Sequence, residues 1–213
     1  IAVGYNSGDV SFVVANNNKI YGNVSYGISS TGPVVDGKSN WWGSNTGPTY
    51  SGNPCGTGDA ISANVLYDPW KNAASMDFDI YQLQDFTVTE NSSICVGGTA
   101  NITLSGSQLG VGFDYLYDLY KDNMLVSGET QTGTGNPLAW TVSTGSNATY
   151  TVKAKNDLNL CTLDMTGSAT VFIGPITTLP TLTACANSLV EVPVTVTDFN
   201  DVGSISLKLN YDK

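Results

Sequence analysis

The sequence predicts an all-β protein. Thr, Ser, Asn and Gly make up 88 of the 213 residues, and charged residues make up only 12%, against about 25% in ordinary globular domains. No long stretch repeats its apolar residues with the period of a helix, so we expect almost no helix. Short apolar runs between Asn and Gly turns, and longer runs that alternate apolar with polar residues, predict strands instead.

Residues 1–75 consist of short apolar runs separated by turn residues. The runs are 10–14, 19–21, 26–28 and 33–35. Their spacing is too short and irregular for a β-sandwich. Asn and Gly tolerate left-handed backbone conformations, which a chain needs when it turns a corner every few residues. Stacking such coils would pair their strands in parallel and let their asparagines bond from one coil to the next.

Two segments in this region resemble a known family. The first is Val35-Asp36-Gly37-Lys38-Ser39-Asn40-Trp41-Trp42-Gly43-Ser44-Asn45-Thr46-Gly47-Pro48, and the second is residues 58–70. They resemble the last coil and the cap of right-handed parallel β-helices of the pectate-lyase-like family. The resemblance covers about a third of the chain. It implies that residues 1–75 are the terminal coils and cap of such a β-helix, and we expect a linker at 76–82.

Three tryptophans have a role in that interpretation. The resemblance implies that Trp41, Trp42 and Trp70 close the open end of the β-helix core as parts of its cap. The alternative is that the adjacent Trp41 and Trp42 stack on sugar rings and form a carbohydrate-binding platform.

Residues 83–174 change to longer alternating strands. Ala100, Ile102 and Leu104 fall on one side of a strand, and a similar alternation recurs at residues 113–119 and 150–154. The turns between these runs come at the intervals of a sandwich, so we expect a seven-strand Greek-key β-sandwich. In the strand at 113–119, Tyr115 and Tyr117 would face the core, and Tyr120, just beyond it, would face the other way.

The same region resembles the immunoglobulin-like repeats of large bacterial surface proteins. The resemblance rests on Ile94-Cys95-Val96-Gly97-Gly98 and on Leu160-Cys161-Thr162. It implies a disulfide between Cys95 and Cys161, with a stabilisation of roughly 4 kcal/mol on the chain-entropy model. Cys55 and Cys185 would then be unpaired or bonded to sequence outside this span. None of the four cysteines has the spacing of a CxxC metal site.

The last region begins after a predicted linker at 175–180. Residues 190–199 and 202–211 alternate as two strands joined at Asn200 and Asp201. They resemble the opening strands of cohesin-like jelly-roll modules, so residues 181–213 are expected to be the incomplete start of such a module. Unpaired strands at either end would need partners, either flanking domains of the same polypeptide or neighbouring copies that form a homopolymer by strand addition.

Charge and composition exclude several function classes. The chain has eight lysines, eighteen acidic residues, no histidine and a net charge of −10, and its lysines are scattered. We therefore expect no nucleic-acid binding and no attachment to an anionic membrane. Without histidine there is no Ser-His or Cys-His nucleophile pair. No stretch is long and apolar enough to span a membrane, so no membrane insertion is expected.

The acidic residues do not form a recognisable catalytic site. Glycosidases of the β-helix type use two or more carboxylates on one face, whereas Asp36, Asp59 and Asp68 belong to the predicted cap. Lyases of this type add a basic group beside calcium, and arginine is absent. We expect no enzymatic activity.

Calcium is possible because carboxylate and carbonyl oxygens bind it, but no motif supports it. One candidate set is Asp77, Asp79 and Asp85, and the other is Asp198, Asp201 and Asp212. Neither set forms a D-x-D-x-D-G loop. Turn-capping or solvated roles are expected, with no metal and no cofactor.

The sequence thus predicts a structural or adhesive segment of a large modular bacterial protein, secreted or on the cell surface, which could form part of a fibre. Disulfides and a sequence pI of about 4.1 suit an oxidising extracellular compartment. Two alternatives stay open. One is a non-catalytic spacer of a carbohydrate-active β-helix enzyme, and the other is a carbohydrate-binding module whose partner is a polysaccharide.

Overall fold

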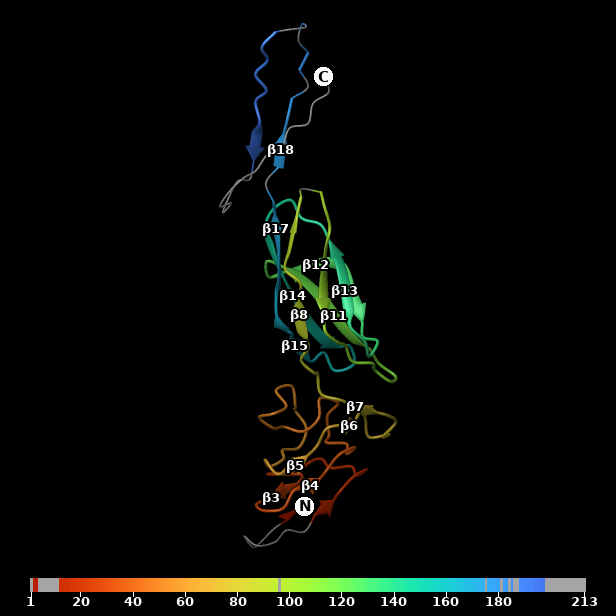
Figure 1. Ribbon diagram of the computed structural model, residues 1–213. Helices are drawn as coiled ribbons and strands as arrows, with labels where there is room; N and C mark the ends of the chain where they lie inside the picture. The colour runs from red at the N-terminus through yellow and green to blue at the C-terminus, as the bar shows by residue number, and fades with distance from the viewer. Residues whose placement is uncertain are drawn as a thin grey trace.

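A computed structural model describes residues 2–3, 12–95, 97–174, 176–180, 182–183, 185 and 188–197 (Figure 1). The described part of the chain is all-β, as predicted, and contains no helix. No segment of it is therefore a helix that could cross a membrane. Its buried apolar residues form two clusters, one in the N-terminal part and one in a larger pair of sheets. Figure 1 shows these parts one after the other along an elongated molecule.

The N-terminal part is built from very short strands. β2, β4 and β5 form a parallel sheet in which Val13, Val35 and Val65 lie in register, and β1 pairs in parallel with β3. β6 pairs with β7 in the antiparallel sense. The strands are β1 (Ala2–Val3), β2 (Val13–Val14), β3 (Ser29–Ser30), β4 (Val35–Asp36), β5 (Val65–Leu66), β6 (Trp70–Lys71) and β7 (Asp79–Ile80).

Asparagine side chains hold the turns between these strands. Asn40 is fully buried, and its amide donates to the carbonyl oxygens of Gly37 and Ala15 while its Oδ1 accepts the backbone N–H of Asn18. This one side chain therefore satisfies backbone groups of two successive turns of chain, which buried polar groups require. Asparagines are expected from the sequence to bond from one coil to the next in this way.

The larger part consists of two sheets that enclose one core. The first sheet has the strand order β13-β10-β8-β16. The second has the order β12-β11-β14-β17-β9, with β15 also paired to β14. The strands are β8 (Thr87–Thr89), β9 (Ser92–Ile94), β10 (Ala100–Leu104), β11 (Tyr115–Lys121), β12 (Met124–Thr132), β13 (Leu138–Val142), β14 (Ala148–Asn156), β15 (Thr162–Asp164), β16 (Thr166–Gly167) and β17 (Ala169–Ile173).

The predicted alternation of this region is confirmed. Ala100, Ile102 and Leu104 are buried along β10, and Tyr115 and Tyr117 are buried along β11. The ten described strands outnumber the seven predicted because two stretches of the chain, β8–β9 and β15–β17, divide between the two sheets. β8 pairs with β10 in the first sheet, whereas β9 pairs with β17 in the second. Likewise β15 and β17 pair with β14 in the second sheet, whereas β16, which lies between them in sequence, pairs with β8 in the first.

Both predicted linkers contain strands. β7 lies within 76–82, and its Ile80 is fully buried in the N-terminal core. β18 (Ile176–Thr178) lies within 175–180 and pairs antiparallel with β19 (Thr195–Thr197). β19 falls in the strand predicted at 190–199. The second strand of the predicted module, at 202–211, lies outside the described residues.

Candidate functional site

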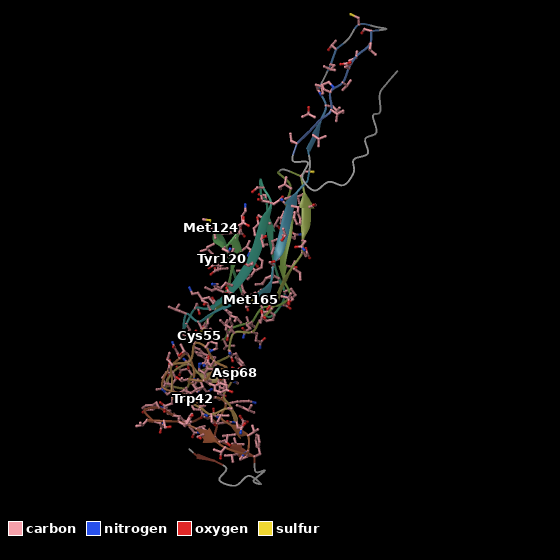
Figure 2. The ribbon with its side chains drawn as sticks, turned by 90° about the vertical axis from the view of Figure 1, so that its left-hand side faces the viewer. Trp42, Cys55, Asp68, Tyr120, Met124 and Met165 are labelled. Atoms are coloured by element: carbon pink, nitrogen blue, oxygen red, sulfur yellow. A yellow bond between two sulfur atoms is a disulfide. The ribbon has the colours of Figure 1, made fainter. Side chains whose placement is uncertain are left out.

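The junction between the N-terminal part and the sandwich is the most elaborately bonded region of the described chain. Its centre is a disulfide between Cys55 and Cys161, whose Cα atoms are 5.8 Å apart although the residues are 106 positions apart in sequence. Cys55 comes from a loop of the N-terminal part, and Cys161 follows the turn after β14. Figure 2 shows Cys55 and Asp68 where the two parts meet.

The predicted disulfide between Cys95 and Cys161 is therefore wrong. Cys95 and Cys185 are free and exposed. Cys95 follows β9, whose last residue Ile94 lies in register with Ile173 at the end of β17. Cys161 lies before β15, so β15, β16 and β17 separate the two cysteines along the sandwich. Cysteines that can bond have Cα atoms within about 7 Å, and opposite ends of a sandwich do not satisfy this.

Asparagines reinforce the disulfide. The backbone carbonyl of Asn45 accepts the indole N–H of Trp70 at 2.9 Å and the side-chain amide of Asn159 at 3.1 Å. The side chain of Asn45 donates in return to the carbonyl of Leu158 at 3.4 Å. A single peptide group thus connects the N-terminal core to the turn that carries Cys161.

Gln82 bonds to both parts at once. Its backbone N–H donates to Asp68 Oδ1 at 3.0 Å and its Nε2 donates to the carbonyl of Gly52 at 2.6 Å. Its Oε1 accepts from the hydroxyl of Tyr67 at 2.9 Å. On the sandwich side its carbonyl accepts Nε2 of the buried Gln108 at 2.9 Å. The chain that connects the two parts is therefore fixed to each of them.

Aromatic rings fill the space beside this connection. The hydroxyl of Tyr115 donates to the carbonyl of Tyr81 at 2.7 Å and accepts its N–H at 3.2 Å. Phe78 stacks on Phe113 with ring centroids 5.7 Å apart. Burial raises the pKa of the Tyr115 hydroxyl, and burial together with Asp68 raises the pKa of Tyr67 to about 12. Both phenols therefore stay protonated and able to donate at neutral pH.

The cavity described at the junction is too small for a ligand. The cavity beneath the disulfide has a volume of about 10 Å³, which is at the limit for one water molecule. Burial raises the pKa of Asp68, and the N–H of Gln82 and the charge of Lys38 oppose this shift. The Asp68 carboxylate accepts the backbone N–H of Gln82. The side chains of the junction therefore hold the two parts together.

The three tryptophans occupy different environments. Trp42 is 0% exposed and Trp70 is 3% exposed, and both belong to the N-terminal core. Trp41 is partly exposed and pairs through its backbone with Lys19. Because the Trp42 ring is fully covered, the platform predicted from Trp41 and Trp42 together is wrong. The three positions remain compatible with the cap that the resemblance implies.

The acidic candidates are not brought together. Asp79 forms an ion pair with Lys71 at 3.1 Å, Asp77 accepts from Ser75, and Asp85 accepts from Thr166. Within the described ranges, no three acidic or cysteine residues form a group that could hold a metal ion. The predicted set Asp198, Asp201 and Asp212 lies outside those ranges.

Asp36 and Asp59 likewise accept backbone hydrogen bonds. Asp36 accepts the N–H of Lys38, and Asp59 accepts the N–H groups of Gly22 and Asn23. These bonds give both carboxylates structural roles in the turns of the N-terminal part.

No protein-family model matches the chain, and no curated protein matches it. The local sequence contains no motif that predicts the residues of the junction. Asn45, Gln82 and Asn159 lie in ordinary turn or connecting segments, and Cys55 was one of four cysteines with three possible pairings.

Proposed function

We propose that this chain is a structural segment of a large modular protein that acts outside the cell. The observation that carries the proposal is the junction, where a disulfide and the hydrogen bonds of Gln82 and Asn45 fasten two parts of the chain. Adjacent domains usually move relative to each other. A covalent bond between them opposes this motion, as a spacer or stalk requires. A disulfide is also typical of oxidising compartments, which favours a secreted or cell-surface location.

The pairing of the strands supports the identities proposed for the parts. Parallel pairing of β2, β4 and β5 and the bonds of Asn40 support the end of a parallel β-helix at 1–75. The strand order supports an immunoglobulin-like sandwich at 83–174. One sheet contains the neighbours β13-β10-β8 and the other contains β12-β11-β14-β17. Immunoglobulin-like sandwiches divide their strands between two sheets in this way. The cohesin-like assignment of 181–213 rests on its sequence.

The partners proposed for such a segment are the flanking domains of its own polypeptide or neighbouring copies. Addition of a strand from a neighbouring copy would build a head-to-tail fibre. The proposed role includes no catalysis.

Small-angle X-ray scattering tests the structural role. The oxidised chain is expected to scatter as one elongated particle with a single interdomain arrangement. The Cys55→Ser/Cys161→Ser variant is expected to sample a wider range of maximum dimensions, and Cys95→Ser is the matched control that leaves the junction intact. Broad interdomain motion in the oxidised wild-type chain would contradict the proposal.

A separate assay tests the absence of catalysis. Incubation with pectin, alginate and other acidic glycans is expected to release no product. Reproducible cleavage that disappears when one Asp is replaced would show that the chain is an enzyme.

A further inference from the structure

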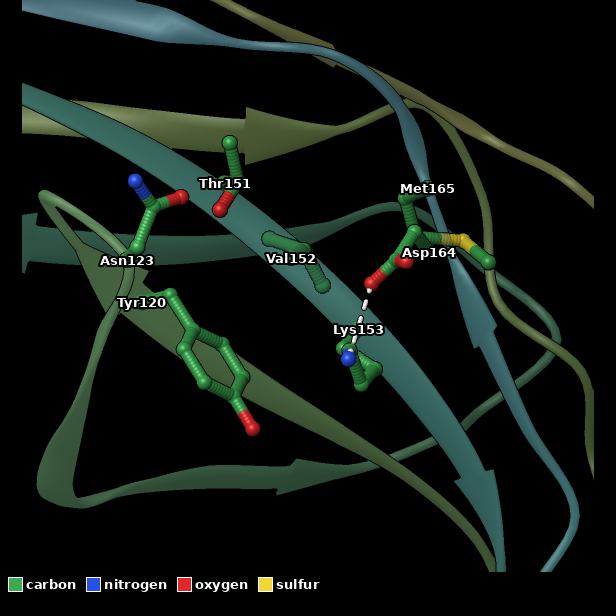
Figure 3. Close-up of a pocket in the computed structure, with 7 residues that line it drawn as sticks. All are labelled: Tyr120, Asn123, Thr151, Val152, Lys153, Asp164 and Met165. Atoms are coloured by element: carbon green, nitrogen blue, oxygen red, sulfur yellow. Dashed lines mark ion pairs between the residues drawn. The ribbon is translucent and has the colours of Figure 1, made fainter.

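A groove on the second sheet of the sandwich lies apart from the junction. Its volume is about 330 Å³, within the roughly 300–1,000 Å³ typical of small-molecule sites. Figure 2 shows Tyr120 on the sandwich, away from Cys55 and Asp68. The close-up in Figure 3 shows the lining residues, which are Tyr120, Asn123, Thr151, Val152, Lys153, Asp164 and Met165.

The groove lies where β14 changes its neighbour. β17 pairs with Ala148–Tyr150 of β14, and β15 pairs with Lys153–Lys155. Thr151 and Val152 fall between these two pairings because the intervening chain crosses to the other sheet as β16. Met165 makes the one backbone bond at this point, from its N–H to the carbonyl of Val152 at 2.9 Å. The interruption of the strand leaves a hollow beside Tyr120.

An ion pair and an aromatic ring form one side of the groove. The ammonium of Lys153 lies 3.1 Å from Asp164 Oδ1 and 5.6 Å from the centroid of the Tyr120 ring. The ammonium is thus neutralised by a carboxylate and held near the ring. The groove therefore contains an aromatic ring, and the cation that lies over this ring is paired with a carboxylate.

Three other side chains offer hydrogen bonds to a ligand. Within the described part of the chain, the Tyr120 hydroxyl, the Asn123 amide and the Thr151 hydroxyl have no hydrogen-bond partner in the protein. Asn123 has a φ of 66° and follows Asp122, whose φ is 49°, as in the tight turns that connect hairpin strands. Asp122 also bonds twice to the backbone of Thr149, so the turn is fastened to β14.

We propose that this groove binds a neutral saccharide. A pyranose ring has an apolar C–H face that can lie on Tyr120, and a hydroxyl edge that can bond to Asn123, Thr151 and Asp164. The charges of the groove and of the whole chain disfavour acidic ligands. Lys153 is already paired with Asp164, and the chain carries a net charge of −10, which disfavours uronic acids and nucleotides.

Nuclear magnetic resonance of the ¹⁵N-labelled chain tests the proposal. The probes are neutral oligosaccharides of glucose, xylose, mannose and N-acetylglucosamine, with an oligogalacturonate as the acidic comparison. At least one neutral probe is expected to shift the amide resonances of Tyr120, Asn123 and Thr151, with a Kd of about 1 mM. No shift with any neutral probe at about 10 mM, ten times that Kd, would overturn the proposal. Tighter binding of the acidic probe would also overturn it.

Variants distinguish this groove from other surfaces. Tyr120→Ala is expected to weaken binding about tenfold, and Thr151→Val and Asn123→Gly each by about three- to tenfold. Valine suits a strand and glycine suits a positive φ, so both variants should keep the fold. Tyr26→Ala, at an exposed tyrosine of the N-terminal part, is the matched control and should bind normally. Unchanged affinity in a folded Tyr120→Ala variant would overturn the assignment.

Discussion

Individual side chains at the junction perform tasks that their types alone do not specify. Gln82 and Gln108 are amides that any loop could carry, yet each bonds to backbone groups at the boundary between the two parts. An amide suits this position because it donates and accepts at once without a charge to desolvate. The hydroxyl of Tyr115 likewise donates to and accepts from the backbone of Tyr81 without a charge to desolvate.

The Cys55–Cys161 disulfide leads to a prediction about the reactivity of the four cysteines. Alkylation of the native chain followed by peptide mapping should label Cys95 and Cys185 and leave Cys55 and Cys161 unlabelled. The Cys55→Ser/Cys161→Ser variant should lose about 2–5 kcal/mol of unfolding free energy, because it releases a long closed loop. Cys95→Ser should change stability little. Labelling of Cys55 in the native chain would contradict the observed pairing.

Asp68 gives a prediction with a defined pH dependence. Its folded pKa is raised chiefly by burial, so the folded state binds this proton more tightly than the unfolded state. Ionisation of Asp68 therefore costs stability at neutral pH, and the cost disappears as the pH falls through the folded pKa toward the unfolded value of 3.8. Asp68→Asn keeps an acceptor for the Gln82 N–H without the charge.

The variant should accordingly be more stable than wild type at neutral pH, by up to about 1 kcal/mol, and equally stable below about pH 4. Urea unfolding at several pH values measures the difference, with Asp77→Asn, at an exposed position, as the control. A stability gain for Asp68→Asn that grows as the pH falls would reverse the expected sign.

At the scale of elements, the interrupted pairing along β14 determines where the groove lies. The crossing of β16 to the first sheet divides the chain that pairs with this side of β14 into β15 and β17. This division creates the groove at Thr151 and Val152. Cys161 lies just before β15, after the turn that follows β14. The strands next to β14 therefore border both the proposed binding groove and the junction.

Close packing between turns gives a prediction for the N-terminal part. A Cβ at Gly58 would lie 2.4 Å from the carbonyl oxygen of Trp42 and 2.8 Å from that of Gly47. Both contacts are with backbone, which cannot move aside cheaply. Gly58→Ala should therefore destabilise this part by about 1–3 kcal/mol.

Chemical denaturation monitored by tryptophan fluorescence would measure the effect of Gly58→Ala. The matched control is Gly145→Ala, because a Cβ at Gly145 meets nothing within 4 Å. That variant should be neutral or slightly stabilising. Equal stability of the two variants would show that the turns of the N-terminal part tolerate expansion.

At the scale of the whole molecule, the junction should couple the unfolding of the two cores. The disulfide, the hydrogen bonds of Gln82 and the packing of Phe113 against both clusters connect the two cores. Calorimetry of the oxidised chain should therefore show one main transition. The Cys55→Ser/Cys161→Ser variant should show two, because each core can then unfold by itself. Two transitions in the oxidised chain would mean that the junction transmits little stability.

The sequence by itself determined the all-β class and the faces of the main strands. Alternation in β10, β11 and β14 predicted their buried residues correctly, because a side-chain period of two is a local property of extended chain. In residues 1–75, short apolar runs separated by Asn and Gly predicted parallel pairing of strands. Asn and Gly allow the sharp turns that stacked coils require.

Only the tertiary structure decided which cysteines pair, what covers Trp42 and where a groove opens beside Tyr120. The partner of Cys161 lies 106 positions away in another part of the chain. The groove depends on a strand that leaves one sheet for the other. Local sequence specifies neither feature, because the relative placement of elements is set by how whole cores pack, and residues distant in sequence meet only after that packing is complete.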